Sequence, residues 1–277
     1  SYKDKRIQVR SNSGKGILAA LATGQQFISG SYVTRMDADD VMPSYKLKSL
    51  LDILHVNTLG TVSTGKLKYF SDTVISPGYR LYESWLNETQ ERGLFYERIY
   101  RECVVASPNW LMHRQDFDTI GGFQQLSYPE DYDMVFKWRE AGFNIKSTDS
   151  ITHHWREHPQ RTSRNSDTYQ QESFFRLKTP YFIEEFKNRR IQLIGAKKKG
   201  KLIAQILREY ALEFDWYEQD QSLIDITIDS IQIKDIQFLK KEEACILSIY
   251  PEASLKEQLE AFITKRGYYI GANAHYF

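Results

Sequence analysis

Acidic side chains gather in one short stretch of this chain, where Asp37, Asp39 and Asp40 fall within four positions. The stretch follows residues 32–36, which are expected to form a strand. Carboxylates crowded at a strand end repel one another, and Mg²⁺ or Mn²⁺ offsets that repulsion because these ions prefer hard oxygen ligands. Pro43 favours a helix start, so a helix is expected over about residues 44–54. The stretch is a candidate metal site, and an acidic turn that merely caps this helix is the alternative.

A second acidic cluster opens the helix that we expect over residues 130–141, where Glu130, Asp131 and Asp133 fall within four positions. The helix dipole by itself favours one or two acidic residues in a first helical turn. A third acidic residue in this turn suggests that the cluster also has a chemical role. A carboxylate held ionised at a helix N-terminus can serve as the general base for a hydroxyl group.

Histidine and arginine are concentrated in a third stretch, which holds three of each within residues 153–164. The combination is typical of a site for a diphosphate and its metal ion, and a solvated basic loop is the alternative.

A glycine-rich turn at residues 14–16 precedes a helix expected over residues 17–26, and its backbone N–H groups could hold a phosphate. Candidates to stack on a sugar face, or equally to pack in the core, are Trp110, Tyr128 and Trp155.

Strands and helices alternate along the chain, which predicts an α/β fold. In the first part the expected strands are 6–10, 32–36 and 61–70, and the further helices are 79–91 and 115–120. An exposed loop is expected over residues 155–166 and a connecting segment over 179–190. The pattern then restarts, with strands at 191–194, 214–217 and 244–249 and helices at 202–210 and 255–266. We therefore place a boundary near residue 185, between domains 1–185 and 186–277.

The composition is that of a folded globular protein, with 41% hydrophobic and 26% charged residues among 277 and a formal net charge of +1. Near-zero charge gives no reason to expect nucleic-acid binding. The two cysteines, Cys103 and Cys245, lie far apart, which suits a reducing compartment. The sequence shows no apolar run of about 20 residues and no signal-peptide pattern. We expect a cytoplasmic location, with association at the inner face of the membrane left open.

Taken together, these stretches resemble the family 2 glycosyltransferases, whose nucleotide-sugar-binding domain has the GT-A fold. The resemblance covers roughly residues 5–170. It is carried, in order, by residues 12–21, 32–43, 107–108, 121–123, 130–133 and 155–158. It implies an α/β domain in which helices flank a mostly parallel sheet.

The resemblance assigns the first acidic stretch to a nucleoside-diphosphate sugar donor. It implies that Asp37 lies near the ribose and that Asp39 holds an Mn²⁺ or Mg²⁺ ion bridging the diphosphate, with Asp40 assisting. His158 falls where a late loop residue can reach the metal or the diphosphate. Further residues expected at the donor site are Asn12, Lys15, Arg35 and Arg156.

The second acidic cluster is assigned to the acceptor. Asp131 matches the acid taken as catalytic base, and Glu130 stands beside it. A metal would neutralise charge on the diphosphate leaving group while the base takes the proton of the acceptor hydroxyl. Separate carboxylate clusters for these two tasks are what a single-displacement, inverting transfer requires.

Two features depart from the family pattern. Family members normally begin with strands that form the nucleobase side of the pocket, and this sequence starts after them, as an N-terminally truncated chain would. The exposed sheet edge could then pair with a second copy. The C-terminal part resembles a small Rossmann-like domain, but Lys197 replaces the central glycine of the Gly-x-Gly-x-x-Gly pattern. Glu218 is placed for a ribose contact, although a docking or structural role is favoured.

The sequence thus predicts a metal-dependent, inverting glycosyltransferase with a polysaccharide, lipid-linked or protein-glycan acceptor. Two other classes stay open. A scaffold subunit derived from such an enzyme would keep the motifs without binding UDP and Mn²⁺. A nucleotidyltransferase would release pyrophosphate instead of a nucleoside diphosphate.

Overall fold

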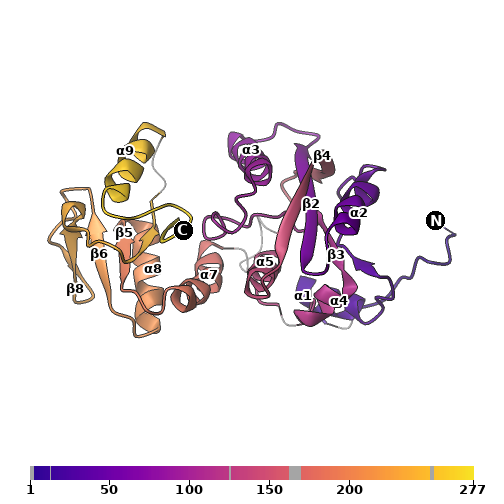
Figure 1. The fold of residues 1–277 in the computed structure, drawn as a ribbon, viewed down its shortest axis with the longest axis horizontal. Coiled ribbons are helices and arrows are strands. Elements are labelled where there is room, and N and C mark those ends of the chain that lie inside the picture. Colours follow the sequence, from indigo (N-terminus) through magenta and orange to yellow (C-terminus); the bar gives the residue numbers. More distant parts are fainter. Residues whose placement is uncertain (1–2, 13, 125, 162–169, 250–252) are drawn as a thin grey trace. The chain divides into compact units, whose positions relative to one another are not determined.

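The computed structural model describes the chain except for residues 1–2, 13, 125, 162–169 and 250–252 (Figure 1). The chain forms two compact units, one of residues 1–93 and 105–158 and the other of residues 94–104 and 159–277. The division therefore falls earlier than the predicted boundary near residue 185. Helix α7 (Gln171–Glu185) belongs to the second unit, where its Phe182 packs edge-on against Tyr100 at 5.2 Å between ring centroids.

Helix α7 also corrects the connecting segment predicted over residues 179–190. Pro180 lies inside this helix, although proline removes a backbone hydrogen bond and usually ends a helix. Burial of Phe175, Leu177 and Phe182 stabilises α7 despite that loss.

The first unit is built on a four-stranded sheet in the order β1-β3-β2-β4. Its strands are β1 (Tyr32–Val33), β3 (Trp110–His113), β2 (Thr61–Phe70) and β4 (Asn144–Arg156). Strands β2 and β4 run parallel, whereas β3 runs antiparallel to both β1 and β2. The α/β class is confirmed, and the expected mostly parallel arrangement holds for strand direction, because β1, β2 and β4 run the same way and β3 runs opposite to them. The reversed direction of β3 depends on the path of the chain between strands. A four-residue apolar run in the sequence does not indicate that path.

The first unit also contains helices, several of which contact this sheet. They are α1 (Gly16–Gln25), α2 (Lys46–Val56), α3 (Pro77–Arg92), α4 (Arg114–Thr119) and α5 (Glu130–Glu140). Leu50 and Leu54 of α2 pack against Leu111 of β3, and α5 buries Val135 and Trp138. These helices lie where the apolar periodicity predicts them, within a few residues at each end.

The strand predicted over residues 6–10 does not form. Described residues 3–12 contain no strand, and the side chains of Ile7 and Val9 are exposed. Alternating residues form a stable strand only when a neighbouring strand accepts their backbone hydrogen bonds.

The second unit contains a six-stranded sheet in the order β10-β9-β5-β6-β8-β7. The strands are β5 (Ile191–Ile194), β6 (Phe214–Glu218), β7 (Thr227–Ile228), β8 (Ile231–Asp235), β9 (Ala244–Leu247) and β10 (Ala274–Tyr276). All neighbours run parallel except β7 and β8. Between these strands in sequence lie the helices α8 (Lys198–Glu209) and α9 (Ala253–Thr264) and the 3₁₀ turn η2 (Ile236–Phe238). This arrangement matches the small parallel α/β domain expected from the sequence.

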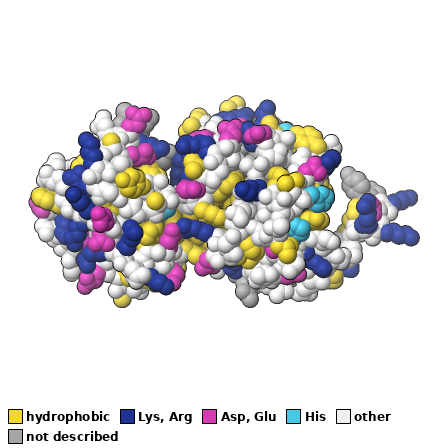
Figure 2. Space-filling view, in the orientation of Figure 1, with side chains coloured by type: hydrophobic (Ala, Val, Ile, Leu, Met, Phe, Trp, Pro, Cys, Tyr) yellow, Lys and Arg dark blue, Asp and Glu magenta, His cyan; other side chains and the backbone are white. Residues whose placement is uncertain are grey.

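Basic and acidic side chains are mixed on the visible face of each unit, in keeping with the near-zero net charge (Figure 2). Across the described parts of the chain, no helix combines the length and the apolar character needed to cross a bilayer.

Candidate active site

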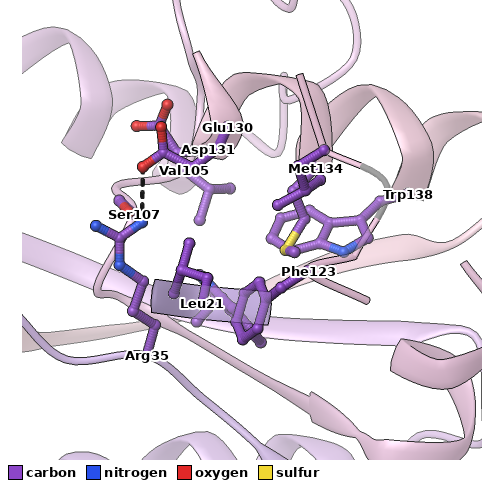
Figure 3. Close-up of a pocket in the computed structure, with 11 residues that line it drawn as sticks. Leu21, Arg35, Val105, Ser107, Phe123, Glu130, Asp131, Met134 and Trp138 are labelled. Atoms are coloured by element: carbon purple, nitrogen blue, oxygen red, sulfur yellow. Dashed lines mark hydrogen bonds and ion pairs between the residues drawn. The ribbon is translucent and has the colours of Figure 1, made fainter. Parts of the chain in front are cut away.

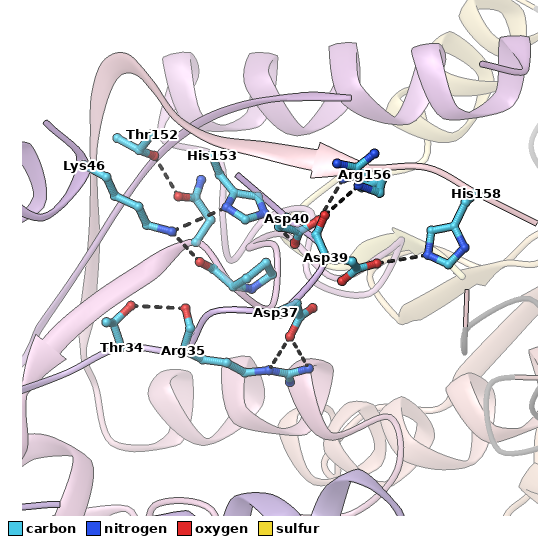
Figure 4. A network of polar contacts seen from close by, with 12 residues as sticks. Thr34, Arg35, Asp37, Asp39, Asp40, Lys46, Thr152, His153, Arg156 and His158 are labelled. Atoms are coloured by element: carbon cyan, nitrogen blue, oxygen red, sulfur yellow. Dashed lines mark hydrogen bonds and ion pairs between the residues drawn. The ribbon is translucent and has the colours of Figure 1, made fainter. Parts of the chain in front are cut away.

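The acidic turn after β1 is attached to the end of β4 through Asp40. One oxygen of the Asp40 carboxylate lies 2.9 Å from His153 Nε2, and the other accepts a hydrogen bond of 2.8 Å from the backbone N–H of Arg156. The Asp40 side chain is only 1% exposed. Because both oxygens are engaged and buried, the Asp40 side chain anchors the turn, and its predicted role in metal binding stays a prediction (Figure 4).

Asp39 and His158 face each other at the open side of the same turn. Asp39 Oδ2 lies 3.0 Å from His158 Nε2, and both side chains are partly exposed to solvent. Arg156 Nε donates to the backbone carbonyl of Asp39 at 2.8 Å, and its guanidinium lies over the Phe70 ring at 4.4 Å. Two side chains predicted to contact the metal or diphosphate are thereby brought together, although they are 119 positions apart in sequence.

The pair also has the chemistry of a partial metal site. Among the residues that the structure describes, no group of three or more His, Cys, Asp or Glu side chains is arranged to hold an ion. Mg²⁺ at phosphate-transfer sites, however, commonly takes one or two protein ligands and completes its shell with substrate oxygens and water. The carboxylate of Asp39 and the imidazole of His158 fit that pattern.

Arg35 links the acidic turn to the second acidic cluster. Its guanidinium lies 3.0 Å from Asp37 Oδ1 and 3.0 Å from Glu130 Oε1 (Figures 3 and 4). The Arg35 side chain is 13% exposed and that of Glu130 is 3% exposed. The two carboxylate clusters therefore meet across one arginine, and Glu130 acts as the partner of Arg35 at this junction.

A small cavity of about 10 Å³, room for about one water molecule, lies beside Asp131. Its walls include Arg35 and Glu130 together with Ser107 and Trp138 (Figure 3). Burial of the Asp131 carboxyl group and the negative charge of Glu130 raise the pKa of Asp131 to about 7, and the positive charge of Arg35 opposes this rise. A carboxyl group with such a pKa is suited to exchange a proton near neutral pH.

Helix α5 begins so that its first two acidic residues reach this cavity. Pro129 precedes the helix in an extended conformation, and the backbone N–H of Tyr132 donates to Asp131 Oδ1 at 2.9 Å. Asp133 instead accepts from the backbone N–H of Ser127 at 2.7 Å, so it fastens the preceding loop to the helix. Of the three clustered acids, only Glu130 and Asp131 line the cavity.

The remaining predicted donor residues lie before α1. Asn12 Oδ1 accepts hydrogen bonds from the backbone N–H of Gly14 and from Thr23 Oγ1, at 3.2 and 3.0 Å. The side chain of Asn12 therefore shapes the turn, and Lys15 is exposed at the start of the helix. Donor contacts by these two residues stay predictions.

The aromatic candidates separate into different environments. Trp110 is buried and packs against Phe117 and Trp138 of the core. Trp155 is half-buried and stacks on Tyr69, with 5.2 Å between the ring centroids. The predicted loop over residues 155–166 begins as strand, because Trp155 and Arg156 end β4. Arg164 of that stretch lies outside the described residues.

Lys46 is a site-related residue that sequence reasoning missed. Its ammonium is buried behind the acidic turn. The signal was present, since Lys46, Leu50 and Leu54 recur every four residues and all three are buried on one face of α2. A lysine at an apolar position of an amphipathic helix indicates a buried partner.

Glu218 in the second unit does not have the environment predicted for a ribose contact. Its buried carboxylate accepts from the backbone N–H groups of Ala196 and Gln219, both at 2.7 Å. The carboxylate thus binds the β5–α8 turn, where a parallel nucleotide-binding domain would place a phosphate. This arrangement favours a structural role for Glu218.

Two comparisons with known proteins bear on the function of this chain. Residues 1–121 match the model of glycosyl transferase family 2. An uncharacterized glycosyltransferase of Haemophilus influenzae is 23% identical over 238 residues, covering 78% of this chain and 72% of that protein. The family match spans residues 1–121, and the two matches together support a role in glycosyl transfer.

Proposed function

We propose that this chain is an inverting, metal-dependent glycosyltransferase that uses a nucleoside-diphosphate sugar and a hydroxyl acceptor of a polysaccharide, a lipid-linked sugar or a protein glycan. The observation that carries the proposal is the junction at Arg35, which brings the acidic turn and the head of α5 to one place. The match to a glycosyltransferase family supports the reaction class, and the junction supports an arrangement in which one cluster serves the donor and the other the acceptor.

Asp39 and His158 are the residues that would hold Mn²⁺ or Mg²⁺, together with oxygens of the donor diphosphate. When bound, the ion supplies positive charge that stabilises the departing diphosphate. Arg156 lies next to this pair, with its guanidinium also 3.3 Å from the exposed carboxylate of Asp72. A phosphate group can displace an exposed carboxylate from an arginine because it offers a similar bidentate acceptor.

Asp131 is the proposed base. As the acceptor oxygen forms its bond to the anomeric carbon, the bond from that carbon to the diphosphate oxygen breaks and the acceptor proton passes to the Asp131 carboxylate. A single displacement of this kind inverts the anomeric configuration. Glu130 contributes by holding Arg35 and by raising the pKa of Asp131, so it is a positioning residue in this scheme.

Titration of the full chain with UDP and Mn²⁺, followed by calorimetry, tests the donor half of the proposal. Binding that is lost in Asp39→Ala supports it, and a chain that binds none of the common nucleoside diphosphates with Mn²⁺ fits a scaffold instead. Incubation with nucleotide sugars and mixed glycan acceptors tests the reaction. Release of a nucleoside diphosphate supports glycosyl transfer, whereas release of pyrophosphate identifies a nucleotidyltransferase.

A further inference from the structure

A buried chain of polar contacts lies behind the acidic turn and takes no part in the reaction described above (Figure 4). Lys46 is the first residue of α2 and His153 lies in β4, and both side chains are buried. Lys46 Nζ lies 2.6 Å from the carbonyl oxygen of Pro108 and 3.5 Å from His153 Nδ1. His153 Nε2 in turn lies 2.9 Å from Asp40 Oδ2.

The direction of each hydrogen bond follows from the chemistry of the groups. An ammonium group can only donate, so His153 Nδ1 is the acceptor from Lys46. His153 Nε2 then carries the hydrogen and donates it to the Asp40 carboxylate. With a neutral imidazole between them, the positive charge of Lys46 and the negative charge of Asp40 balance, as buried charges must.

This chain of contacts fixes the segment that carries Asp39. Beyond Asp40, Val41 exchanges two backbone hydrogen bonds with His154, each of 3.0 Å. Arg156 donates its backbone N–H to Asp40 and its Nε to the carbonyl of Asp39. The acidic turn is therefore fastened to the last residues of β4, and the chain continues from β4 directly to His158.

The other end of the chain of contacts reaches the segment that lines the cavity beside the proposed base. Pro108, which accepts from Lys46, follows Ser107, and Ser107 lines the cavity beside Asp131. Ser107 Oγ and Trp138 Nε1 are buried in that cavity without a hydrogen-bond partner among the described residues. Lys46 thus joins the backbone next to the proposed base to the turn that carries the proposed metal ligand.

We propose that Lys46 and His153 are positioning residues, which act through Asp40 to hold Asp39 opposite His158. The inference rests on the proposed function, because it assigns these residues to the donor half of that site. Partners that orient a metal ligand from behind it commonly affect metal affinity or activity by about 10- to 100-fold when removed. Lys46 and His153 lie behind the turn. They therefore act through their contacts with Pro108 and Asp40.

The chain offers a matched control for Lys46, because Lys178 of α7 is also a buried lysine. Lys178 Nζ donates to the carbonyl of Tyr100 at 2.7 Å and is 2% exposed, compared with 1% for Lys46. It lies in the second unit. Lys46→Met and Lys178→Met therefore each remove a buried amino group and one bond to a backbone carbonyl, in two different places.

Two readouts are compared for these variants. The first is the affinity for UDP in the presence of Mn²⁺, which should fall on the order of 10- to 100-fold in Lys46→Met and stay near wild type in Lys178→Met. The second is hydrogen–deuterium exchange of peptides that cover residues 36–44 in the unliganded protein. Exchange there should speed up in Lys46→Met alone. Equal loss of affinity in both variants, or unchanged exchange in Lys46→Met, would overturn the proposal.

His153 provides a second comparison if Lys46→Met fails to fold. A glutamine amide can accept from Lys46 with its oxygen and donate to Asp40 with its nitrogen, whereas leucine can do neither. His153→Gln should keep UDP–Mn²⁺ affinity within a few-fold of wild type, and His153→Leu should lose it. Similar affinities for the two variants contradict the role of His153.

The two readouts also separate this inference from the proposed function. If the wild-type chain binds no nucleoside diphosphate, the proposed function fails, and the exchange of residues 36–44 still decides whether Lys46 holds the turn. If the wild type binds UDP and Mn²⁺ but Lys46→Met binds equally well, the function stands and the positioning role falls.

Discussion

Replacing Arg35 with methionine tests the junction on which the site depends. The substitution keeps much of the side-chain volume but leaves the Glu130 carboxylate, only 3% exposed, without its cation. Removing one partner of a buried ion pair costs about 3–5 kcal/mol, because the charge left behind is poorly solvated. We expect Arg35→Met to lower the free energy of unfolding of the first unit by about that amount.

A double-mutant cycle isolates the contribution of the pair. Glu130→Gln removes the negative charge with little change in shape, and the double variant removes both charges. Since the double variant leaves no isolated buried charge from this pair, the coupling energy should be about 1–3 kcal/mol. Asp37, the other partner of Arg35, is 29% exposed and can be solvated, so its coupling to Arg35 should be smaller.

Urea unfolding followed by tryptophan fluorescence measures these energies. Four of the five tryptophans lie in the first unit, so the signal reports mainly on that unit. Arg176→Met is a suitable control, because Arg176 pairs in the second unit with the exposed carboxylates of Glu172 and Glu209 and its loss should change little. Effects of Arg35→Met and Glu130→Gln that add to within about 0.5 kcal/mol would refute the buried junction.

Three further predictions concern Asp131 of the second acidic cluster. Asp131→Asn should abolish sugar transfer while UDP–Mn²⁺ affinity, measured by calorimetry, stays near wild type, because the base does not hold the donor. Transfer by the wild type should rise with pH through about 7, where the Asp131 carboxyl loses its proton, as a pH–rate profile will show. Since the folded state keeps that proton while the unfolded chain, with a pKa of 3.8, releases it, stability falls as pH rises between these two values. Asp131→Asn should therefore melt above the wild type at pH 8 and close to it below pH about 4.

Each of these outcomes has a clear opposite. Near-normal turnover in Asp131→Asn removes Asp131 as the base. A transfer rate that is flat from pH 5 to 8, in a range where donor binding is unchanged, contradicts a base with a raised pKa. Equal melting temperatures of Asp131→Asn and wild type at pH 8 show that the carboxyl group is not held in a destabilising environment.

Local patterns were sufficient for most elements of the fold. The apolar periodicity placed α2 and α5 within a few residues, and β2 and β5 were expected where they occur. Elements whose formation depends on distant partners were less predictable. Helix α7 forms around Pro180 because it packs in the second unit, and residues 6–10 alternate in sequence without forming a strand.

The candidate site divides in the same way. Residue types and spacing identified both acidic clusters, and the family resemblance associated His158 with the metal or diphosphate that Asp39 was expected to bind. They did not separate Asp39, which faces solvent, from Asp40, which is buried against His153. The two residues are both aspartates in the same turn, but their side chains point in different directions. The direction of each side chain depends on the residues that pack against the turn.

The sequence by itself determined the α/β class, the resemblance to family 2 glycosyltransferases and the acidic residues available for chemistry. Those properties depend on residue composition and on the spacing of apolar residues within short segments, both of which can be read from the sequence. Only the tertiary structure decided that Arg35 pairs with Glu130, 95 positions away, and that Lys46 lies beneath the acidic turn. Such contacts form only when two segments that are distant in sequence pack together and exclude water. The sequence of one segment alone therefore does not predict its partner.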